Sequence, residues 1–410
     1  MTGVDSSQPS DRDEARAFLV DMARALASNG TPAHRLEETM TSVADRLGFE
    51  AELFATPTSV FASIAEPGRP AVTTMTRTQP SDVNAERLVL LDELLEDVLA
   101  GEVSPSRGRV LGREIQRRPD RYGAWATAAS IGVASACAGR FFGGGFEEMA
   151  AALLVGLIVG MLAIVSVSRR ELSRLIEFAS GFVSALGAAM LASYVVPMNV
   201  KIVTLAGVIA LVPGLSLTVA INELATRNLV AGGARLLGAV VILVSIGLGV
   251  ALGTRLAMMV GLDASAEAVV LPGWTEYAAL IVAPAALAVL FRVPPRFFGV
   301  VTVIGVCAYL ASRAGSGVLG PELGVSIGAV AVGVLSNLYG RIAKRPVALV
   351  LMPGIILLVP GAIGFRSVSS FLEADAVSGV QAAFTALLVA VSLVAGLLIA
   401  NVAVPARRSL

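Results

Sequence analysis

The stretch LAGVIALVPG (205–214) returns 147 residues later as MPGIILLVPG (352–361), with six of ten positions identical. The same offset places VSIGLG (244–249) over VSLVAG (391–396). Apolar segments often match by chance, but a shared LVPG at a constant offset is harder to explain in that way. The pattern indicates an internal repeat.

The chain around this repeat has the composition of a membrane protein. It is 55% hydrophobic, its mean hydropathy is +0.78, and only 15% of its residues are charged, against about a quarter in soluble domains. From Tyr122 onward we find ten apolar runs of roughly the 17–25 residues that cross a bilayer, and without water their backbones must be helical. The runs are 122–142, 148–168, 176–196, 200–220, 235–255, 276–292, 297–313, 322–340, 347–366 and 381–403.

The 147-residue offset carries each run of the first five onto one of the last five. Because five is odd, the two copies must enter the membrane in opposite directions, as in many secondary transporters. The predicted fold is therefore an all-α polytopic membrane protein with about ten transmembrane helices in two inverted five-helix repeats, at 122–257 and 275–403. A small cytosolic α/β domain, 1–121, precedes them.

Charge distribution supports this division. Residues 1–121 hold 14 Lys+Arg and 20 Asp+Glu, a net charge of −6, whereas residues 122–410 hold 17 and 11. With the N-terminal domain in the cytosol, 16 basic residues fall in cytosolic segments and five outside, which agrees with the positive-inside rule. We expect a multi-pass protein of the cytoplasmic (inner) membrane with both termini in the cytosol. In the outer turn at 143–148, we expect Glu147 and Glu148 to be solvated, and an outer gate is the alternative.

The N-terminal domain has clear local signals. Asn29-Gly30 ends a helix over 12–28, and Thr31-Pro32 is typical of the N-cap and first residue of the next helix, which Gly48 ends. Residues 51–77 predict two or three strands, and further helices are expected at 82–99 and after Ser104-Pro105. His34 is expected to be a first-turn residue with ordinary polar contacts.

Several functional classes are excluded by simple counts. The chain has one histidine, and neither of its two lysines follows a glycine, so a zinc-protease motif and a P-loop are impossible. We assign no catalytic residue, metal site or cofactor, and no basic surface suggests nucleic acid. Cys137 and Cys307 lie in apolar runs and are expected to be small buried core residues.

Three Pro-Gly pairs lie in or near the predicted spans: Pro213-Gly214, Pro353-Gly354 and Pro360-Gly361. Proline removes a backbone donor and glycine lets the helix unwind, and a broken membrane helix can bind the ends of a small solute. We therefore place the pairs in a substrate pathway. The alternative is a packing kink, which is common in membrane helices.

A polar stripe follows the first pair. Gly214, Thr218 and Asn222 share one helical face, and Ser216 and Glu223 share a neighbouring one. The stripe is a candidate pathway lining, or simply the helix emerging into a loop. Glu223 is the candidate proton-coupling carboxylate, because intramembrane acids commonly relay protons.

These motifs resemble one known family, the threonine/serine exporters, from about residue 15 to 403. The resemblance rests on SNGTPAHRLEETM (28–40), TPTSV (56–60), LVPGLSLTVAINEL (211–224) and LMPGIILLVPGAIGFR (351–366). It implies export driven by the proton motive force. In some relatives the two halves are separate proteins implicated in exporting small dicarboxylates. Where the family suggests an Arg-Asp pair after the first LVPG, this chain has Asn222-Glu223, which keeps the acid and loses the base.

The sequence thus predicts a proton-coupled exporter of small hydrophilic amino acids, threonine or serine first. Its partners are the solute, protons and the lipid bilayer, and a homo-oligomer is left open. One alternative is an exporter of a C4-dicarboxylate, for which Arg366 is the most suggestive cation. Another is a membrane scaffold or sensor that transports nothing.

The topology can be tested with single cysteines in a Cys137→Ser, Cys307→Ser background. A cysteine at position 227 should resist an impermeant reagent in intact cells and react once the membrane is opened, because arginine bias places that loop in the cytosol. Labelling of residue 227 from outside would contradict the ten-span topology.

Overall fold

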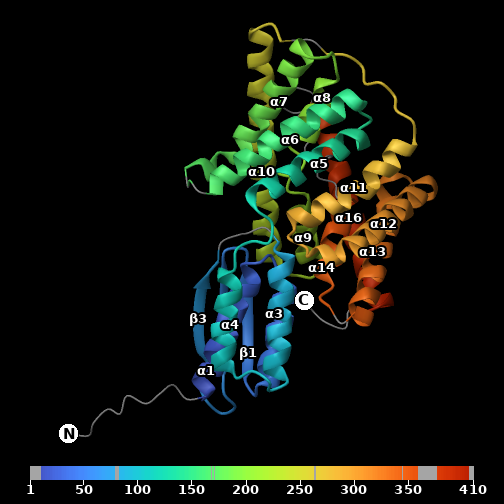
Figure 1. Ribbon diagram of the computed structural model, residues 1–410. Helices are drawn as coiled ribbons and strands as arrows, with labels where there is room; N and C mark the ends of the chain where they lie inside the picture. The colour runs from blue at the N-terminus through green and yellow to red at the C-terminus, as the bar shows by residue number, and fades with distance from the viewer. Residues whose placement is uncertain are drawn as a thin grey trace.

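The N-terminal unit consists of four helices and a three-stranded antiparallel sheet in the order β1-β2-β3 (Figure 1). The structure is a computed structural model that describes residues 11–78, 83–167, 169, 171–262, 265–343, 345–358 and 376–405. The sheet register pairs Glu50 with Ala65 and Ser59 with Arg77. The elements are α1 (Asp11–Ala27), α2 (Ala33–Arg46), β1 (Glu50–Thr56), β2 (Ser59–Ala65), β3 (Val72–Arg77), α3 (Ala85–Leu99) and α4 (Pro105–Arg117).

Capping residues set the ends of these helices. After α1, Gly30 has a φ of +87°, a conformation that glycine adopts without strain. The Asn84 side chain caps α3 by accepting from the backbone N–H of Arg87 at 3.0 Å. One predicted cap is wrong: α2 begins at Ala33 with Pro32 at the N-cap, because Pro32 keeps an extended backbone (φ −59°, ψ 147°). Thr31 thus lies outside the helix.

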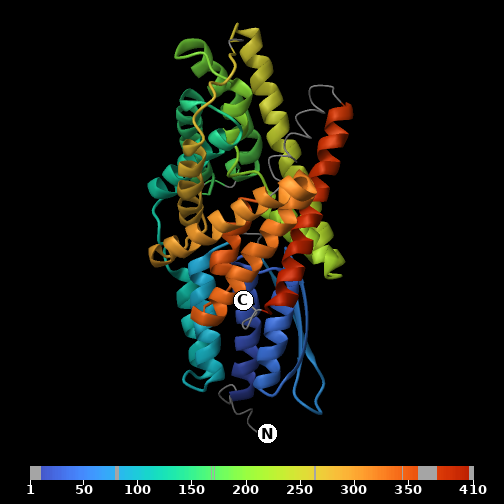
Figure 2. The ribbon, with the colours of Figure 1, turned by 90° about the vertical axis from the view of Figure 1, so that its right-hand side faces the viewer.

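The rest of the described chain is helical (Figures 1 and 2). Within the described residues, six helices are long and apolar enough to cross a membrane, and α9 and α11 are shorter apolar helices. The first half contains α5 (Ala124–Phe141), α6 (Phe146–Val167), η1 (Leu172–Arg174), α7 (Ile176–Tyr194), α8 (Val200–Gly207), α9 (Gly214–Ala225) and α10 (Leu229–Met259). The second half contains α11 (Trp274–Leu290), η2 (Pro295–Phe297), α12 (Phe298–Leu319), α13 (Pro321–Ala343), α14 (Ala348–Ile356) and α16 (Ala376–Ala403).

The predicted fourth span is not one helix. The chain leaves α8 at Gly207 and enters α9 only at Gly214, with Pro213 as the N-cap. Proline cannot donate to the preceding turn, so a break is expected there. The ninth predicted run, 347–366, contains α14, and its residues from 359 onward lie outside the described part. The count of ten spans therefore stays a prediction.

The Pro353-Gly354 pair does not break its helix, contrary to expectation. Both residues are buried inside α14, which continues to Ile356. The proline costs one hydrogen bond, to the carbonyl of Leu349, and a helix packed among neighbours tolerates that loss. A Cβ at Gly354 would lie 2.6 Å from Val332 of α13, so this glycine permits close packing.

Glycines also let the longest helices approach each other. A Cβ at Gly249 of α10 would lie 2.0 Å from the carbonyl oxygen of Phe178 in α7. A Cβ at Gly396 of α16 would lie 2.3 Å from the carbonyl oxygen of Ser326 in α13. Small residues at such crossings are the usual means of packing helices in lipid.

Two further expectations are wrong. Cys307 is exposed on α12, while Cys137 is buried. A cysteine on the outer face of a membrane helix can face lipid, so an apolar run does not determine burial. Glu148 is not solvated: its carboxylate accepts from the backbone N–H groups of Gly145 (2.7 Å) and Asn199 (2.8 Å) and is 2% exposed. Buried acids need such donors.

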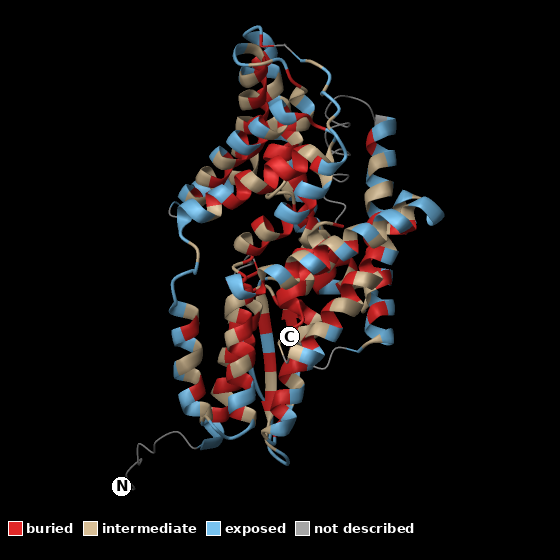
Figure 3. Cartoon of the chain, turned by 45° about the vertical axis from the view of Figure 1, so that its right-hand side comes forward, coloured by how far each residue is buried: buried red, intermediate tan, exposed pale blue. Residues whose placement is uncertain are grey.

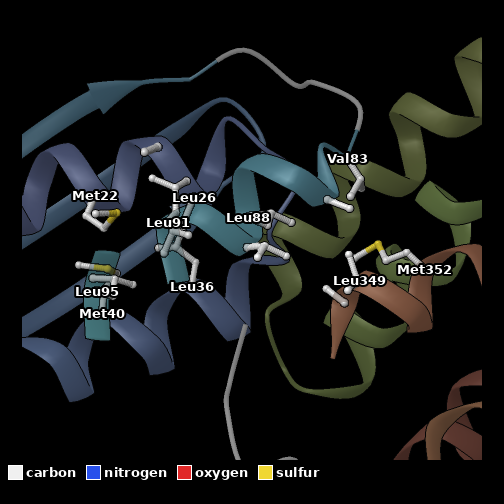
Figure 4. Close-up of a cluster of buried hydrophobic side chains, with 14 of the residues drawn as sticks. Met22, Leu26, Leu36, Met40, Val83, Leu88, Leu91, Leu95, Leu349 and Met352 are labelled. Atoms are coloured by element: carbon white, nitrogen blue, oxygen red, sulfur yellow. The ribbon is translucent and has the colours of Figure 1, made fainter. Parts of the chain in front are cut away.

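The core of the N-terminal unit continues into the second half. Figure 4 shows Leu88 and Val83 beside Leu349 and Met352 of α14, in the same cluster of buried side chains as Leu36. Figure 3 shows buried residues along the facing sides of both parts. The N-terminal unit and the second half therefore share one apolar core.

The close crossing of α7 and α10 predicts that alanine has different effects on stability at two glycines of α10. Gly249→Ala should lower the unfolding temperature in detergent, because its methyl group would overlap a backbone carbonyl and overpacking costs about 1–3 kcal/mol. Gly238→Ala in the same helix is the control: nothing lies within 4 Å of its added Cβ, so alanine should be neutral or stabilising. Equal melting of the two variants would contradict the tight crossing.

Candidate functional site

A cavity of about 630 Å³ lies between the N-terminal unit and the apolar helices. Residues of α2 and α3 form one side, and residues of α9, α13, α14 and α16 form the other. Its size is that of a small-ligand site. Polar side chains from both parts line it, among them His34, Arg35, Thr218, Asn222, Asn337 and Asn401.

The polar stripe of α9 faces this cavity in part. Thr218, which is buried, and Asn222 both line it. The Thr218 hydroxyl donates to the carbonyl of Gly214 (3.2 Å), and the Asn222 amide nitrogen lies 3.3 Å from Nε2 of His34. The end of α9 thus meets the N-terminal unit rather than emerging into a solvated loop.

Glu223 is fully buried, at 0% exposure, and each of its oxygens is hydrogen-bonded. Arg235 of α10 donates through Nε (3.0 Å) and Nη2 (3.1 Å), a two-pronged contact that is strong and directional. The backbone N–H of Ala33, at the start of α2, donates at 3.0 Å. One carboxylate therefore joins α9, α10 and the N-terminal unit.

Arg235 supplies the base that is missing beside Glu223 in the sequence. It lies 12 positions further along the chain, on the next helix. A motif search around the first LVPG cannot find it, because the pairing depends on how α9 and α10 pack. An arginine near the start of a long apolar helix was the only signal.

The Pro353-Gly354 pair does not itself line the cavity, but its neighbours in α14 do. Pro353 and Gly354 are buried within α14, and their neighbours Met352 and Ile355 line the cavity opposite α9. Pro213 and Gly214 are buried at the start of α9, and Ser216 is only half-buried. Pro360, Gly361 and Arg366 lie outside the described residues.

Two groups in the cavity were not assigned from sequence. Burial lowers the pKa of His34 to about 4, and the neighbouring positive charge of Arg35 acts in the same direction. Asn337 of α13 is buried and donates to Asn401 (3.0 Å) and to the carbonyl of Val404 (2.7 Å). Both positions look isolated in the sequence, because their partners are distant along the chain.

Comparison with family models covers almost the entire chain. A model described as a threonine/serine exporter matches residues 17–257, and a second with the same description matches residues 276–403. The chain belongs to the threonine/serine exporter family. This is a family of membrane exporters and not of enzymes. The match includes the N-terminal unit together with α9, both of which line the cavity.

Relatives of this chain are found among fungal proteins. An uncharacterised protein of Schizosaccharomyces pombe is 28% identical over 84% of the chain and 43% of the relative. Pheromone-regulated membrane protein 10 of Eremothecium gossypii is 26% identical over 85% of the chain and 48% of the relative. The protein of the same name from Saccharomyces cerevisiae is 25% identical over 90% of the chain and 48% of the relative. The chain thus spans less than half the length of these curated relatives. No solved structure matches it significantly.

The Glu223–Arg235 pair predicts a selective loss of stability. Arg235→Met should destabilise the protein by roughly 3 kcal/mol, because it leaves a buried carboxylate without its cation. Arg255→Met, an exposed arginine on the same helix, should change the unfolding temperature little. Adding Glu223→Gln to Arg235→Met should restore part of the loss, since no buried charge then remains. Thermal unfolding in detergent measures all three, and equal effects of the two arginines would contradict the pairing.

Proposed function

We propose that this exporter moves small hydrophilic amino acids, L-threonine or L-serine first, out of the cytosol by proton-coupled secondary transport. In this proposal it lies in the cytoplasmic membrane with both termini and the N-terminal unit in the cytosol. The observation that carries the proposal is the cavity that α9, α14 and the N-terminal unit line, in a chain of an exporter family. Helix α9 begins at the break that follows α8.

The repeat supports a transporter architecture. Gly249 and Gly396 are separated by the 147-residue offset, and each packs against a backbone carbonyl of a neighbouring helix, at Phe178 and Ser326 respectively. Those partners are separated by nearly the same offset. We infer that α7–α10 and α13–α16 are equivalent pairs of two inverted repeats, with the solute held between the halves.

The Glu223 carboxylate supports proton coupling. Its charge attracts Arg235, and its Oε1 holds the N–H of Ala33. Protonation would remove the attraction to Arg235 and weaken the contact with α2. A group that changes helix contacts when it binds a proton is what proton-driven alternating access requires.

Charge in the cavity favours an amino acid over a dicarboxylate. The charged side chains that line it, within the described residues, are two arginines and three acids: Arg35, Arg46, Glu38, Asp92 and Glu96. A dianion would meet a lining with excess negative charge, whereas a zwitterion carries groups of both signs. Arg366, the suggestive cation for a dicarboxylate, lies outside the described residues.

Inside-out membrane vesicles test the function directly. Vesicles that contain the protein should accumulate labelled threonine or serine when the lumen is acidic, and an ionophore that collapses the gradient should stop uptake while ATP is present. Succinate tests the dicarboxylate alternative in the same assay. If the vesicles take up succinate but neither amino acid, the protein is a dicarboxylate exporter. If correctly folded protein takes up none of these solutes, the result favours a membrane scaffold.

Neutralising the carboxylate should separate transport from coupling. In the Glu223→Gln, Arg235→Met double variant, which buries no unpaired charge, the proton gradient should no longer drive accumulation. Exchange of internal for external substrate should continue, because exchange needs no net proton movement. Arg255→Met is the control and should retain both activities. Gradient-driven accumulation by the double variant would show that protons are coupled elsewhere.

A further inference from the structure

Two buried polar atoms beside the cavity have no hydrogen-bond partner among the described residues, and a cation lies next to them. The Thr31 hydroxyl and Nδ1 of His34 are buried and make no hydrogen bond to any residue that the structure describes. Arg35 has no hydrogen bond or ion pair to any described residue; its strongest favourable electrostatic neighbour is Glu38. Thr31 itself is 8% exposed, and all three residues line the same cavity.

The hydrogen-bonding role of His34 follows from its surroundings. Burial, Arg35 and Arg235 lower its pKa and Glu223 raises it, with a result of about 4, so the ring is neutral at pH 7. The amide nitrogen of Asn222 faces Nε2, which therefore accepts. The hydrogen of a neutral ring must then lie on Nδ1, the atom without a partner.

All three groups are donors, and two of them, the Thr31 hydroxyl and Nδ1 of His34, are buried atoms without an acceptor among the described residues. A buried donor without an acceptor destabilises a folded protein, and nearly all such groups in proteins are paired. Burial lowers the pKa of Arg35 and the charge of Glu38 raises it. An anionic acceptor would satisfy a guanidinium, a hydroxyl and an imidazole N–H together. The planar fork of arginine matches a carboxylate best.

We propose that Thr31, His34 and Arg35 form the binding site for the carboxylate of the transported amino acid at the cytosolic mouth of the pathway. The inference rests on the proposed function and makes the N-terminal unit part of the transport path. It assigns the first contact with the solute to α2, which lies outside the apolar helices.

Acidic side chains on the same side of the cavity suit the other end of a zwitterion. Asp92 and Glu96 of α3 and Glu38 of α2 line the cavity. Carboxylates attract an ammonium group, and the amide oxygens of the asparagines on α9 and α16 can accept from a hydroxyl. A small hydroxy amino acid therefore finds a partner for each of its polar groups.

Equilibrium binding to the purified full-length chain in detergent tests the site. The probes are labelled L-threonine and L-serine, with L-threoninamide and succinate as competitors. The wild type should prefer threonine to threoninamide, which has no carboxylate. Arg35→Gln should weaken threonine binding by about tenfold or more, as expected for loss of a charged hydrogen bond, and should abolish the preference over threoninamide.

Two further variants make the test specific. Arg46→Gln also removes a cation of the cavity lining, but from the exposed far end of α2. It should leave the preference for threonine unchanged, whereas a general electrostatic effect would reduce binding equally in both arginine variants. Thr31→Val keeps the shape and removes only a hydroxyl without a partner, so the protein should fold normally and bind threonine more weakly.

The outcomes separate this inference from the proposed function. If the wild type exports threonine and Arg35→Gln binds it with unchanged affinity and preference, the carboxylate site is overturned and the function stands. If the folded wild type binds neither threonine nor serine, the proposed function is contradicted, and the carboxylate site is contradicted with it. If succinate binds more tightly than threonine and Arg35→Gln abolishes that binding, the zwitterion site as proposed is overturned.

Discussion

The contact between Glu223, Arg235 and the N–H of Ala33 joins the N-terminal unit to α9 and α10. A fully buried carboxylate is tolerated only when its charge is paired and its oxygens are hydrogen-bonded. Here the donors come from two different parts of the chain, α10 and the start of α2. Because the Glu223 carboxylate needs these donors, the end of α9 is held against both α10 and the start of α2. This contact also sets where the cavity lies.

The N-terminal unit is attached unequally to the two halves. Its apolar core continues into α11, α12 and α14, and Leu349 and Met352 belong to the same cluster as Leu36 (Figure 4). From the first half, by contrast, Ala231 and the partly buried Leu215 are the apolar members of that cluster in the described part of the chain. Contacts with α9 are mainly polar, through Asn222 and Glu223. The contact with the second half is therefore hydrophobic and extended, whereas the contact with the first half is polar and local.

Much of this arrangement could be predicted from local sequence signals. Asn29-Gly30 ends a helix as expected, and Pro213-Gly214 coincides with a break before α9. The predictions that were wrong concern residues whose surroundings depend on packing between distant segments. Glu148 looked solvated but is held by Asn199, and Pro353 looked like a helix break but lies inside α14.

The candidate site was predictable only in part, for the same reason. Thr218 and Asn222 follow from helical periodicity, because both lie on one face of one helix. Arg35 and His34 belong to another unit, some 180 residues earlier, and they lie near the α9 residues only because packing forms the cavity. Local sequence specifies which groups a helix offers, whereas tertiary packing decides which groups remain without a partner.

The unequal attachment has a mechanical consequence for the proposed transport cycle. Separating apolar surfaces costs free energy in proportion to their area, so the N-terminal unit should move together with the second half. The polar contact at Glu223 is local, and its strength changes when the carboxylate gains a proton. Motion of the first half against the rest would therefore open or close the cavity at α9, beside Thr31, His34 and Arg35. In that cycle the solute and the proton would act on opposite sides of the same short stretch of α2, since Ala33 contacts Glu223 and its neighbours face the cavity.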